Sequence, residues 1–482
     1  MQLDVQTIAG LTGARITGSS TQAVLGAEID SRRVRPGDLF VCLPGTRVDG
    51  HDFALKACEQ GAAALLATRD LPEVERSWPD RAILVVPDAQ EALIAVARHV
   101  RAQFRGTVIG LTGTAGKTTV KEWLSCVLGQ SGSVARTEGN FNNQLGLPLT
   151  ICRAGGQEDF WVVEAGVSHA GDMELLAGIL RPDLGIVLNA GTGHTEGLGD
   201  KGVAWHKTRM FTLLNVGGSA LTCADYPDLK EQAREACAAS GAPLLFFSVA
   251  ETAEEYRTRT SDPEIACVAW QERPGMCHVR VRFREDVREI TLKLPMNGHA
   301  AVENCACVAL ACVLVHQSLA ALDHLEAGLG SARVPDHRFA CTRTGNSVLI
   351  DDSYNANPLS MHRMLDAAMD VSVREGRPLA VLLGSMGELG SEAARAHREL
   401  GQHLAALRPA FVLWKGDWQD EVREGLGDGI PFAVFAGEED LEHALKTLLT
   451  DDRRRQGITL LCKGSHSNQL EKAASLCLSL LA

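Results

Sequence analysis

The sequence lacks the features that mark membrane-spanning, secreted and low-complexity chains. Its longest uncharged apolar run, Cys305 to Val315, has 11 residues, whereas roughly 20 are needed to span a bilayer. The first residues, MQLDVQTIAG, show no basic segment followed by an apolar core and a small-residue cleavage site. No low-complexity linker and no internal repeat is present. We therefore expect a cytoplasmic protein in which Cys305 to Val315 forms a buried helix.

The sequence also has few positive charges relative to negative ones, and it lacks paired cysteines of the CxxC kind. The 482 residues hold 47 Lys plus Arg against 60 Asp plus Glu, a formal net charge of -13. This balance disfavours non-specific nucleic-acid binding, although a local basic cluster can still hold a phosphorylated small molecule. The 14 cysteines are scattered singly with no CxxC pair, which disfavours a disulfide framework or a zinc site. We expect most of them to be reduced core residues.

Length and pattern predict an α/β protein with three domains. At roughly 150 residues per domain, the chain makes about three folding units. Residues 1–105 mix short apolar runs with helical stretches and predict a small α/β domain. Residues 106–332 predict a larger α/β domain. Residues 333–482 alternate apolar runs with helical segments, which is typical of a Rossmann-like, doubly wound, largely parallel sheet.

The sharpest local signal follows the β-rich run Thr107 to Thr112 and reads Gly113-Thr114-Ala115-Gly116-Lys117-Thr118-Thr119. In such a turn, backbone N–H groups and a helix N-terminus face phosphates, Lys117 reaches the terminal phosphates, and Thr118 can ligate magnesium. The strict GxxxxGK[ST] pattern needs Gly where this chain has Leu111, so the match is to a shorter variant. An ordinary Gly-rich turn is the alternative. We expect Lys117 to be exposed in a loop.

Two polar residues follow other predicted strands of the central domain. Glu164 ends the run Phe160 to Glu164, where P-loop proteins place a magnesium carboxylate, with a solvated strand-end carboxylate as the alternative. His194 follows a further strand and is by itself more typical of a turn histidine than of a metal ligand. Neither residue is specific alone.

Two segments of the last domain stand where ligands bind in a doubly wound sheet, at the carboxyl ends of strands. One is the run Asp351-Asp352-Ser353-Tyr354-Asn355-Ala356-Asn357-Pro358, in which Pro358 is placed to open a helix. The other is Lys463, after the run Thr459 to Cys462. Turn-forming asparagines and a solvated lysine are the alternatives.

Taken in order, these motifs resemble those of the Mur ligases of peptidoglycan synthesis, which are ATP-dependent amide-bond enzymes. The resemblance runs nearly end to end and also includes Asp30-Ser31-Arg32, Gly139 to Pro148 and Gly384 to Gly390. Gly384 to Gly390 and Asp351 to Pro358 are similar to segments of the family members that join D-alanyl-D-alanine to UDP-N-acetylmuramoyl-tripeptide. A Mur-type ligase with a different amine or carboxylate substrate, or a P-loop ATPase or kinase without ligation, remains open.

The resemblance implies how the substrates and ions bind. The first domain would hold the UDP-sugar near Ser31, Arg32, Asn142 and Asn143, and the central domain would bind ATP and two magnesium ions. The implied metal ligands are Thr118 and Glu164 for one ion, and His194 with a carbamylated Lys207 for the other. Lys117, Glu164, His194 and Lys207 form the implied catalytic set.

The resemblance also implies ligand contacts in the rest of the chain. Asn304 would lie by the adenine, Arg338 near the phosphates and Asp352 on the ribose, and the expected substrate contacts in the last domain are Tyr354, Asn355, Asn357 and Lys463. We expect a monomer without nucleic-acid partners or membrane insertion. The departures from the family pattern, most of them near expected ligand contacts, are Arg209, Ala300, Ala301, His337, Ser385 and His466.

Overall fold

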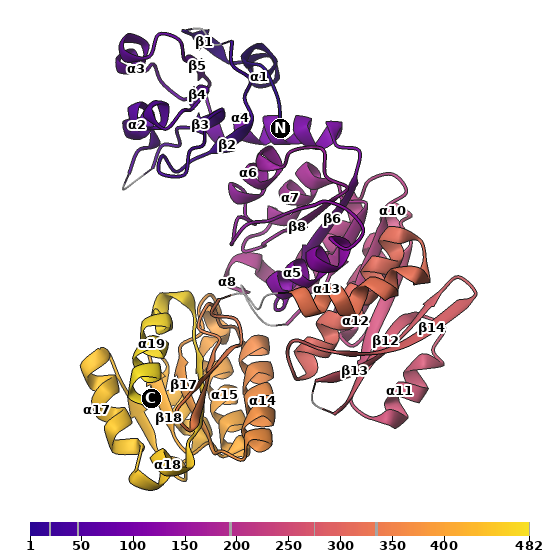
Figure 1. Ribbon diagram of the computed structural model, residues 1–482, viewed down its shortest axis with the longest axis vertical. Helices are drawn as coiled ribbons and strands as arrows, with labels where there is room; N and C mark the ends of the chain where they lie inside the picture. Colours follow the sequence, from indigo (N-terminus) through magenta and orange to yellow (C-terminus); the bar gives the residue numbers. More distant parts are fainter. Residues whose placement is uncertain (19–20, 46–47, 192–194, 274, 333–335, 482) are drawn as a thin grey trace.

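The computed structural model describes residues 1–482 except 19–20, 46–47, 192–194, 274, 333–335 and 482. The described residues form three sheets, each belonging to one part of the chain (Figure 1). The prediction of a three-domain α/β fold is confirmed. The boundaries after residues 105 and 332 stay predictions.

The N-terminal domain contains a five-stranded sheet in the order β1-β5-β4-β3-β2, parallel except for β1. Its elements are α1 (Val5–Thr12), β1 (Arg15–Thr17), β2 (Gly26–Glu28), β3 (Asp38–Val41), the 3-10 helix η1 (Gly50–Phe53), α2 (Ala54–Glu59), β4 (Ala64–Ala67), α3 (Pro72–Ser77), β5 (Ala82–Val85) and α4 (Ala89–Gln103).

The central domain contains a nine-stranded sheet in the order β14-β13-β12-β11-β10-β9-β6-β8-β7. The strands β12, β13 and β14 pair antiparallel and extend an otherwise parallel sheet, an extension that the sequence did not predict. The elements are β6 (Thr107–Thr112), α5 (Lys117–Leu128), β7 (Val134–Arg136), α6 (Gly146–Arg153), β8 (Phe160–Glu164), α7 (Asp172–Leu180), β9 (Leu184–Val187), α8 (Thr195–Leu198), η2 (Gly199–Lys201), α9 (Gly202–Thr208), η3 (Arg209–Leu213), β10 (Ser219–Cys223), α10 (Pro227–Ser240), β11 (Leu244–Ala250), α11 (Ala253–Thr260), β12 (Ile265–Arg273), β13 (Met276–Phe283), β14 (Asp286–Lys293), α12 (His299–His316), η4 (Leu319–His324) and α13 (Leu325–Ser331).

The C-terminal domain contains a six-stranded sheet in the order β15-β16-β20-β17-β18-β19, parallel except for β15. Helices α14, α15 and α16 pack on one face, and α17 and α19 on the other. The elements are β15 (Ala340–Thr344), β16 (Ser347–Asp351), α14 (Pro358–Glu375), β17 (Leu379–Gly384), η5 (Gly390–Glu392), α15 (Ala393–Leu407), β18 (Val412–Lys415), α16 (Gln419–Leu426), β19 (Phe432–Val434), α17 (Glu438–Leu448), α18 (Asp451–Gln456), β20 (Thr459–Lys463), η6 (His466–Asn468) and α19 (Leu470–Leu481).

Helix α12 is a core element of the central domain. Among the described residues it is the one helix whose length and composition would suit a bilayer, yet 78% of that stretch is buried inside the protein. It packs with α5 and α13 against one face of the central sheet. The prediction of a buried helix at Cys305 to Val315 is confirmed. The cysteines are unpaired thiols, and all except Cys126 and Cys341 are buried.

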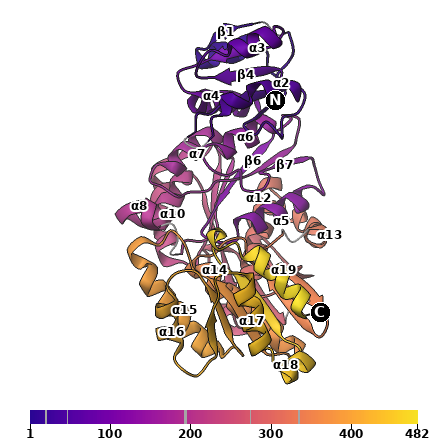
Figure 2. The same ribbon diagram turned by 90° about the vertical axis from the view of Figure 1, so that its left-hand side faces the viewer.

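The two domain junctions differ in their chemistry. One continuous hydrophobic cluster joins the N-terminal and central domains, with α4 packed on α6 and α7 (Figure 2). The two clusters of the C-terminal domain contain no fully buried residue from the central domain, whose Met296 only packs at the edge of one of them. The contacts that dock the C-terminal domain on the central domain are mainly polar, as described below.

The packing of α13 on α5 leads to the first prediction. A Cβ added at Gly328 would lie 2.5 Å from the Cα of Val127, whereas nothing lies within 4 Å of one added at Gly330. Overpacking of this kind costs about 1–3 kcal/mol, so we expect Gly328→Ala to lower the free energy of unfolding by that amount.

Gly330→Ala is the matched control in the same helix. Because alanine is a better helix former than glycine, we expect it to raise the free energy of unfolding by up to about 1 kcal/mol. Urea denaturation of both variants measures the difference. Equal effects would show that α13 does not press on α5 as described.

Candidate active site

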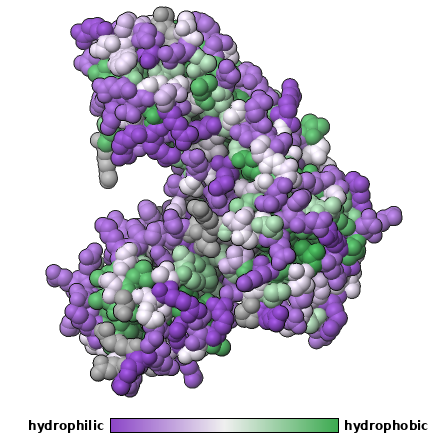
Figure 3. All heavy atoms as spheres, viewed as in Figure 1, coloured by the Kyte–Doolittle hydropathy of each residue, from purple (hydrophilic) through white to green (hydrophobic). Residues whose placement is uncertain are grey.

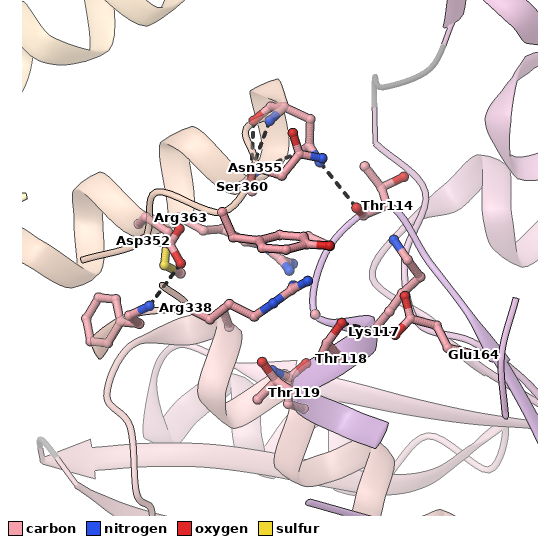
Figure 4. Close-up of a pocket in the computed structure, with 18 of the residues that line it drawn as sticks. Thr114, Lys117, Thr118, Thr119, Glu164, Arg338, Asp352, Asn355, Ser360 and Arg363 are labelled. Carbon is pink, nitrogen blue, oxygen red and sulfur yellow. Dashed lines mark hydrogen bonds between the residues drawn. The ribbon is translucent and has the colours of Figure 1, made fainter. Parts of the chain in front are cut away.

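One pocket collects side chains from the central and C-terminal domains. Parallel strands β6 and β8 end beside it in the central sheet, and β16 and β20 in the C-terminal sheet. Figure 4 shows Lys117, Thr118 and Glu164 in this pocket together with Arg338 and Asp352. The predicted residues that line it are Thr114, Ala115, Gly116, Lys117, Thr118, Thr119, Asn142, Glu164, Lys207, Asn304, Arg338, Asp352, Tyr354, Asn355, Asn357 and Lys463.

The phosphate-loop run forms a turn between β6 and α5 at residues 113–116, and residues 117–119 begin α5. Gly116 has φ +83°, a left-handed conformation that favours glycine, and a Cβ there would lie 2.7 Å from Oδ1 of Asn304. The backbone N–H groups of Thr114 and Ala115 donate to Oδ1 of Asn189 at 3.0 and 2.9 Å. The donors left for a phosphate are therefore those at the start of α5, where the first N–H groups have no acceptor within the helix.

The prediction that Lys117 is exposed in a loop is wrong. Lys117 is the first residue of α5 and is half-buried, and its Nζ donates to the carbonyl oxygen of Gly113 at 2.9 Å. Burial lowers the pKa of Lys117; the charge of Glu164 opposes this shift and that of Arg338 adds to it. Its cation is thus poorly solvated, which favours an anionic ligand beside it.

Thr118 and Glu164 form a buried pair of oxygen groups. The Thr118 hydroxyl donates to Oε2 of Glu164 at 3.0 Å, and Nδ2 of Asn142 donates to Oε1 at 2.8 Å. Glu164 is 2% exposed, so the alternative of a solvated carboxylate is wrong. The hydroxyl of Thr137 accepts a hydrogen bond from the Glu164 backbone, and Lys121 donates to the carbonyl of Thr137. These contacts hold the carboxylate toward the pocket.

Lys207 lies in the same pocket, 2% exposed, near the end of α9. Burial lowers the pKa of Lys207 to about 7, the charge of Lys117 adds to the shift, and Glu164 opposes it. Arg209 instead stacks on the ring of Trp205, with its guanidinium carbon 4.5 Å from the ring centroid. His194 lies outside the described residues.

The C-terminal side of the pocket is built around Asp352. Its Oδ1 accepts from the backbone N–H of Phe339 at 3.0 Å, and its Oδ2 from Nζ of Lys463, which also donates to the carbonyl of Asn355 at 2.8 Å. Lys463 is 2% exposed, so the alternative of a solvated lysine is wrong. Asn357 caps α14 through its side chain and donates from Nδ2 to the carbonyl of Thr114 at 3.2 Å.

Arg338 reaches the pocket from a short segment before β15. Its guanidinium carbon lies 4.0 Å from the ring centroid of Tyr354. The preceding residue, His337, has φ +59°, and its Nδ1 lies 2.7 Å from Oδ2 of Asp351. His337 stands where the resemblance implies glycine, and the positive φ gives the physical reason for glycine at that position.

Four of the predicted residues that the structure describes lie outside the lining of this pocket: Gly113, Ser31, Arg32 and Asn143. Ser31 is buried in the N-terminal domain, and Arg32 pairs with Asp30 while its side chain stays 77% exposed. The side chain of Asn143 accepts from the backbone N–H groups of Leu145 and Gly146, and so shapes the start of α6. Figure 3 shows the molecule hollowed between the N-terminal and C-terminal domains, on the side where a ligand could join them.

The departures from the family pattern occupy different places. Ala300 lines the pocket, and Ala301 is buried in the core. Ser385 donates to Oδ1 of Asn468 at 3.1 Å. His466 lies near Tyr354, with 6.1 Å between ring centroids, and lines a neighbouring cleft between the two domains.

Sequence reasoning missed a group of four residues. Asn189, Tyr226, Glu303 and Arg363 come together although the sequence separates them widely. Nothing in a single sequence marks these four residues as a group. Their signal would be a buried ion pair between two domains, which becomes visible only in three dimensions.

Comparison with known proteins supports a single family. Three family models match: "Mur ligase family, catalytic domain" over residues 23–101, "Mur ligase middle domain" over 111–313 and "Mur ligase, glutamate ligase domain" over 337–466. The UDP-N-acetylmuramoyl-tripeptide--D-alanyl-D-alanine ligase of Escherichia coli is 32% identical over 450 residues, covering 92% of this chain and 91% of that protein.

Solved structures agree with this similarity. MurF from Acinetobacter baumannii superposes with a TM-score of 0.83 at 25% identity, covering 100% of this chain and 99% of that one. MurF ligase from Thermotoga maritima in complex with ADP gives 0.76 at 26% identity, covering 95% and 98%. The chain belongs to the Mur ligase family, within its branch of UDP-N-acetylmuramoyl-tripeptide--D-alanyl-D-alanine ligases.

Proposed function

We propose that this protein is an ATP-dependent ligase that adds D-alanyl-D-alanine to UDP-N-acetylmuramoyl-tripeptide in peptidoglycan precursor synthesis. One observation carries the proposal: the phosphate loop with Lys117, Thr118 and Glu164 shares a pocket with Arg338 and Asp352 of a second domain. If the protein were a kinase or a simple ATPase, its N-terminal domain would have no role in the reaction. The identity of the two substrates is inferred from the family to which the chain belongs.

The reaction has two steps, and the pocket supplies charge for both. The peptide carboxylate attacks the γ-phosphorus of ATP, which forms an acyl phosphate and releases ADP. The amine of D-alanyl-D-alanine then attacks the acyl carbon, and phosphate leaves as the amide forms and the amine loses a proton. Lys117 and Arg338 hold the transferred phosphoryl group, while Asn304 and Asp352 hold the nucleoside; positioning and charge neutralisation do most of the work.

The residues beside the phosphate loop fit magnesium. Among the residues that the structure describes, no group of three or more His, Cys, Asp or Glu side chains could hold a metal ion. A hard cation accepts hydroxyl and carboxylate oxygens, however, and Thr118 and Glu164 offer both, buried and 3.0 Å apart. When bound, magnesium would neutralise phosphate charge; Thr118 and Glu164 would hold it, and Asn142 would orient the carboxylate.

A second ion would need a further anionic ligand, which Lys207 supplies once carbamylated. Carbon dioxide reacts with the neutral amine, and burial favours that form of Lys207. The nitrogen lone pair forms the bond to carbon, the amine loses a proton, and the product is an anionic carbamate. Together with His194 it would present the donors that a second magnesium ion requires.

The remaining assignments complete the proposal. Residues 1–105, 106–332 and 333–482 form the UDP-sugar, ATP and C-terminal domains. Ser31, Arg32, Asn142 and Asn143 lie toward the UDP-sugar, and Tyr354, Asn355, Asn357 and Lys463 shape the substrate side of the C-terminal domain. The enzyme works as a cytoplasmic monomer.

Phosphate release tests the proposal directly. We expect release from ATP to require both UDP-N-acetylmuramoyl-tripeptide and D-alanyl-D-alanine, measured by coupled phosphate detection, with the amide product identified by mass spectrometry. Release without either substrate would indicate an ATPase. Release with another amine but not with D-alanyl-D-alanine would indicate a ligase of different specificity, which Ser385 and His466 could confer.

Replacing Lys117 should abolish ligation without unfolding the protein. Of the residues described by the structure, the side chain hydrogen-bonds to Gly113 of its own loop alone, so we expect Lys117→Ala to keep its thermal unfolding temperature. Loss of one such electrostatic contact costs about 10²-fold or more in rate. Lys472→Ala, an exposed lysine on α19, is the control and should keep full activity. A Lys117→Ala enzyme with more than about a tenth of the wild-type rate would refute the phosphate-loop assignment.

Replacing Lys207 should remove a ligand that a small anion can replace. We expect Lys207→Ala to lose about 10²-fold in rate and to regain part of it with formate or acetate, because the added carboxylate occupies the place of the carbamate. The neutral amine increases as pH rises through about 7, so carbamylation of wild-type protein should be greater at pH 8 than at pH 6.

Carbon-13 NMR with labelled bicarbonate measures the carbamate independently of activity. Lys201→Ala, whose exposed amine stacks on Trp205 in the same segment, should neither lose the labelled signal nor respond to carboxylates. A high-resolution crystal structure from bicarbonate buffer with an unmodified Lys207 would contradict the assignment.

A further inference from the structure

A buried ion pair joins the C-terminal domain to the central domain. Arg363 lies in α14, and its guanidinium donates to both carboxylate oxygens of Glu303 in α12, at 3.1 and 2.6 Å. Glu303 is completely buried, and the Arg363 side chain is 11% exposed. Figure 4 shows that Arg363 comes from the C-terminal domain into the nucleotide pocket. Bidentate pairing of this kind fixes the orientation of the two side chains as well as the distance between them.

Glu303 uses both carboxylate oxygens fully. Oε1 also accepts from Nδ2 of Asn189 at 2.7 Å, and Oε2 from the hydroxyl of Tyr226 at 2.8 Å. Although burial alone raises the pKa of Glu303, the charge of Arg363 and these hydrogen bonds hold it below its ordinary value. Within the part of the chain that the structure describes, Arg363 is the one cation that hydrogen-bonds to Glu303, so undocking α14 leaves the carboxylate with two neutral donors. Because charge-assisted, bidentate hydrogen bonds are stronger than neutral ones, the pairing with Arg363 favours the docked state.

The side chain of Asn189 connects this ion pair to the phosphate loop. Its Nδ2 donates to Glu303, and its Oδ1 accepts from the backbone N–H groups of Thr114 and Ala115. An asparagine amide that rotated by 180° would present the wrong group to both partners. Nδ2 also donates to the carbonyl oxygen of Ala115 at 3.2 Å, so Glu303 and the loop together fix the orientation in which Asn189 holds the loop.

A second contact reaches the same loop from α14. Nδ2 of Asn357, the N-cap of the helix that carries Arg363, donates to the carbonyl oxygen of Thr114 at 3.2 Å. Thr114 is thus held through its N–H group by the central domain and through its carbonyl by the C-terminal domain. Helix α14 therefore contacts the loop directly through its N-cap, Asn357, and indirectly through Arg363, six residues later.

We propose that Arg363 is a positioning residue that, through Glu303 and Asn189, makes docking of the C-terminal domain and ordering of the phosphate loop a single event. This inference rests on the proposed function. Nucleotide then binds tightly only when the C-terminal domain is docked, and the acyl phosphate forms only in a pocket that both domains enclose. The Tyr226 hydroxyl donates to the same carboxylate oxygen as Arg363 and accepts a hydrogen bond from Arg363, so it supports the ion pair.

The test combines single and double variants. Arg363→Met removes the charge, both hydrogen bonds to Glu303 and the one to the Tyr226 hydroxyl. Arg363→Lys keeps the charge without the bidentate geometry, and Asn189→Ala breaks the connection to the loop. Arg374→Met is the matched control, because Arg374 lies in the same helix and pairs with Glu375 of its own domain. Thermal unfolding first confirms that each variant folds.

Three measurements follow for each folded variant: ADP affinity by calorimetry, the radius of gyration with saturating ADP by X-ray scattering, and kcat and KM for ATP. For Arg363→Met we expect a larger radius of gyration and about tenfold or more weaker nucleotide binding, because apparent affinity falls with the docked fraction. Arg363→Lys should lie between this variant and wild type, and Arg374→Met should match wild type.

The double variant decides whether the residues act through one another. If they do, Asn189→Ala combined with Arg363→Met weakens ADP binding by less than the product of the two single effects. Effects that multiply, or an Arg363→Met protein with wild-type affinity and radius, would overturn the proposal. ADP binding and scattering need neither substrate of ligation, so a wild-type protein that fails to ligate would count against the proposed function alone.

Discussion

The carboxyl edges of two largely parallel sheets face one another, and this arrangement decides where the strand-end side chains of the pocket lie. In the central sheet, β6 leads to the phosphate loop and β8 ends at Glu164. In the C-terminal sheet, β16 leads to Asp352 and β20 ends at Lys463. Because these residues stand at the ends of rigid strands, the shape of the pocket depends on how the two sheets dock, more than on the conformation of any one loop.

The two junctions of the molecule suit different tasks. The N-terminal and central domains share an apolar cluster, and separating them would expose surface at a cost of about 25 cal/mol per Å². The C-terminal domain is docked largely by hydrogen bonds and an ion pair, which water can replace at lower net cost. We therefore expect the first two domains to behave as one body, against which the third moves during a catalytic cycle.

Much of the fold and part of the site could be predicted from the sequence, because their signals are local. The phosphate loop and the Asp351 to Pro358 segment are short runs at strand ends, and both lie in the pocket. The antiparallel strands β12 to β14 were missed, since pairing between neighbouring strands has a weaker pattern than a strand followed by a helix.

The burial of charge could not be predicted in this way. Lys117 was expected to be exposed and is half-buried at the start of α5, and Lys463 is held by Asp352 and the backbone of Asn355. The ion pair between Arg363 and Glu303 joins residues 60 positions apart in two domains. A charged residue in a sequence is expected by default to be exposed to solvent. Only the packed structure shows which charged side chains are buried against a partner.

His337 has a consequence for the residue that follows it. Glycine at this position would adopt the same positive φ freely, but it would also leave Arg338 free to turn. Here the imidazole contacts Asp351, and the His337 carbonyl accepts a hydrogen bond from the backbone of Tyr354 at 3.2 Å. The backbone entropy of this segment is thus lost when the protein folds, so a ligand that binds Arg338 does not have to order it. Arg338 therefore stands preorganised over the ring of Tyr354, as the proposed phosphate contact would require.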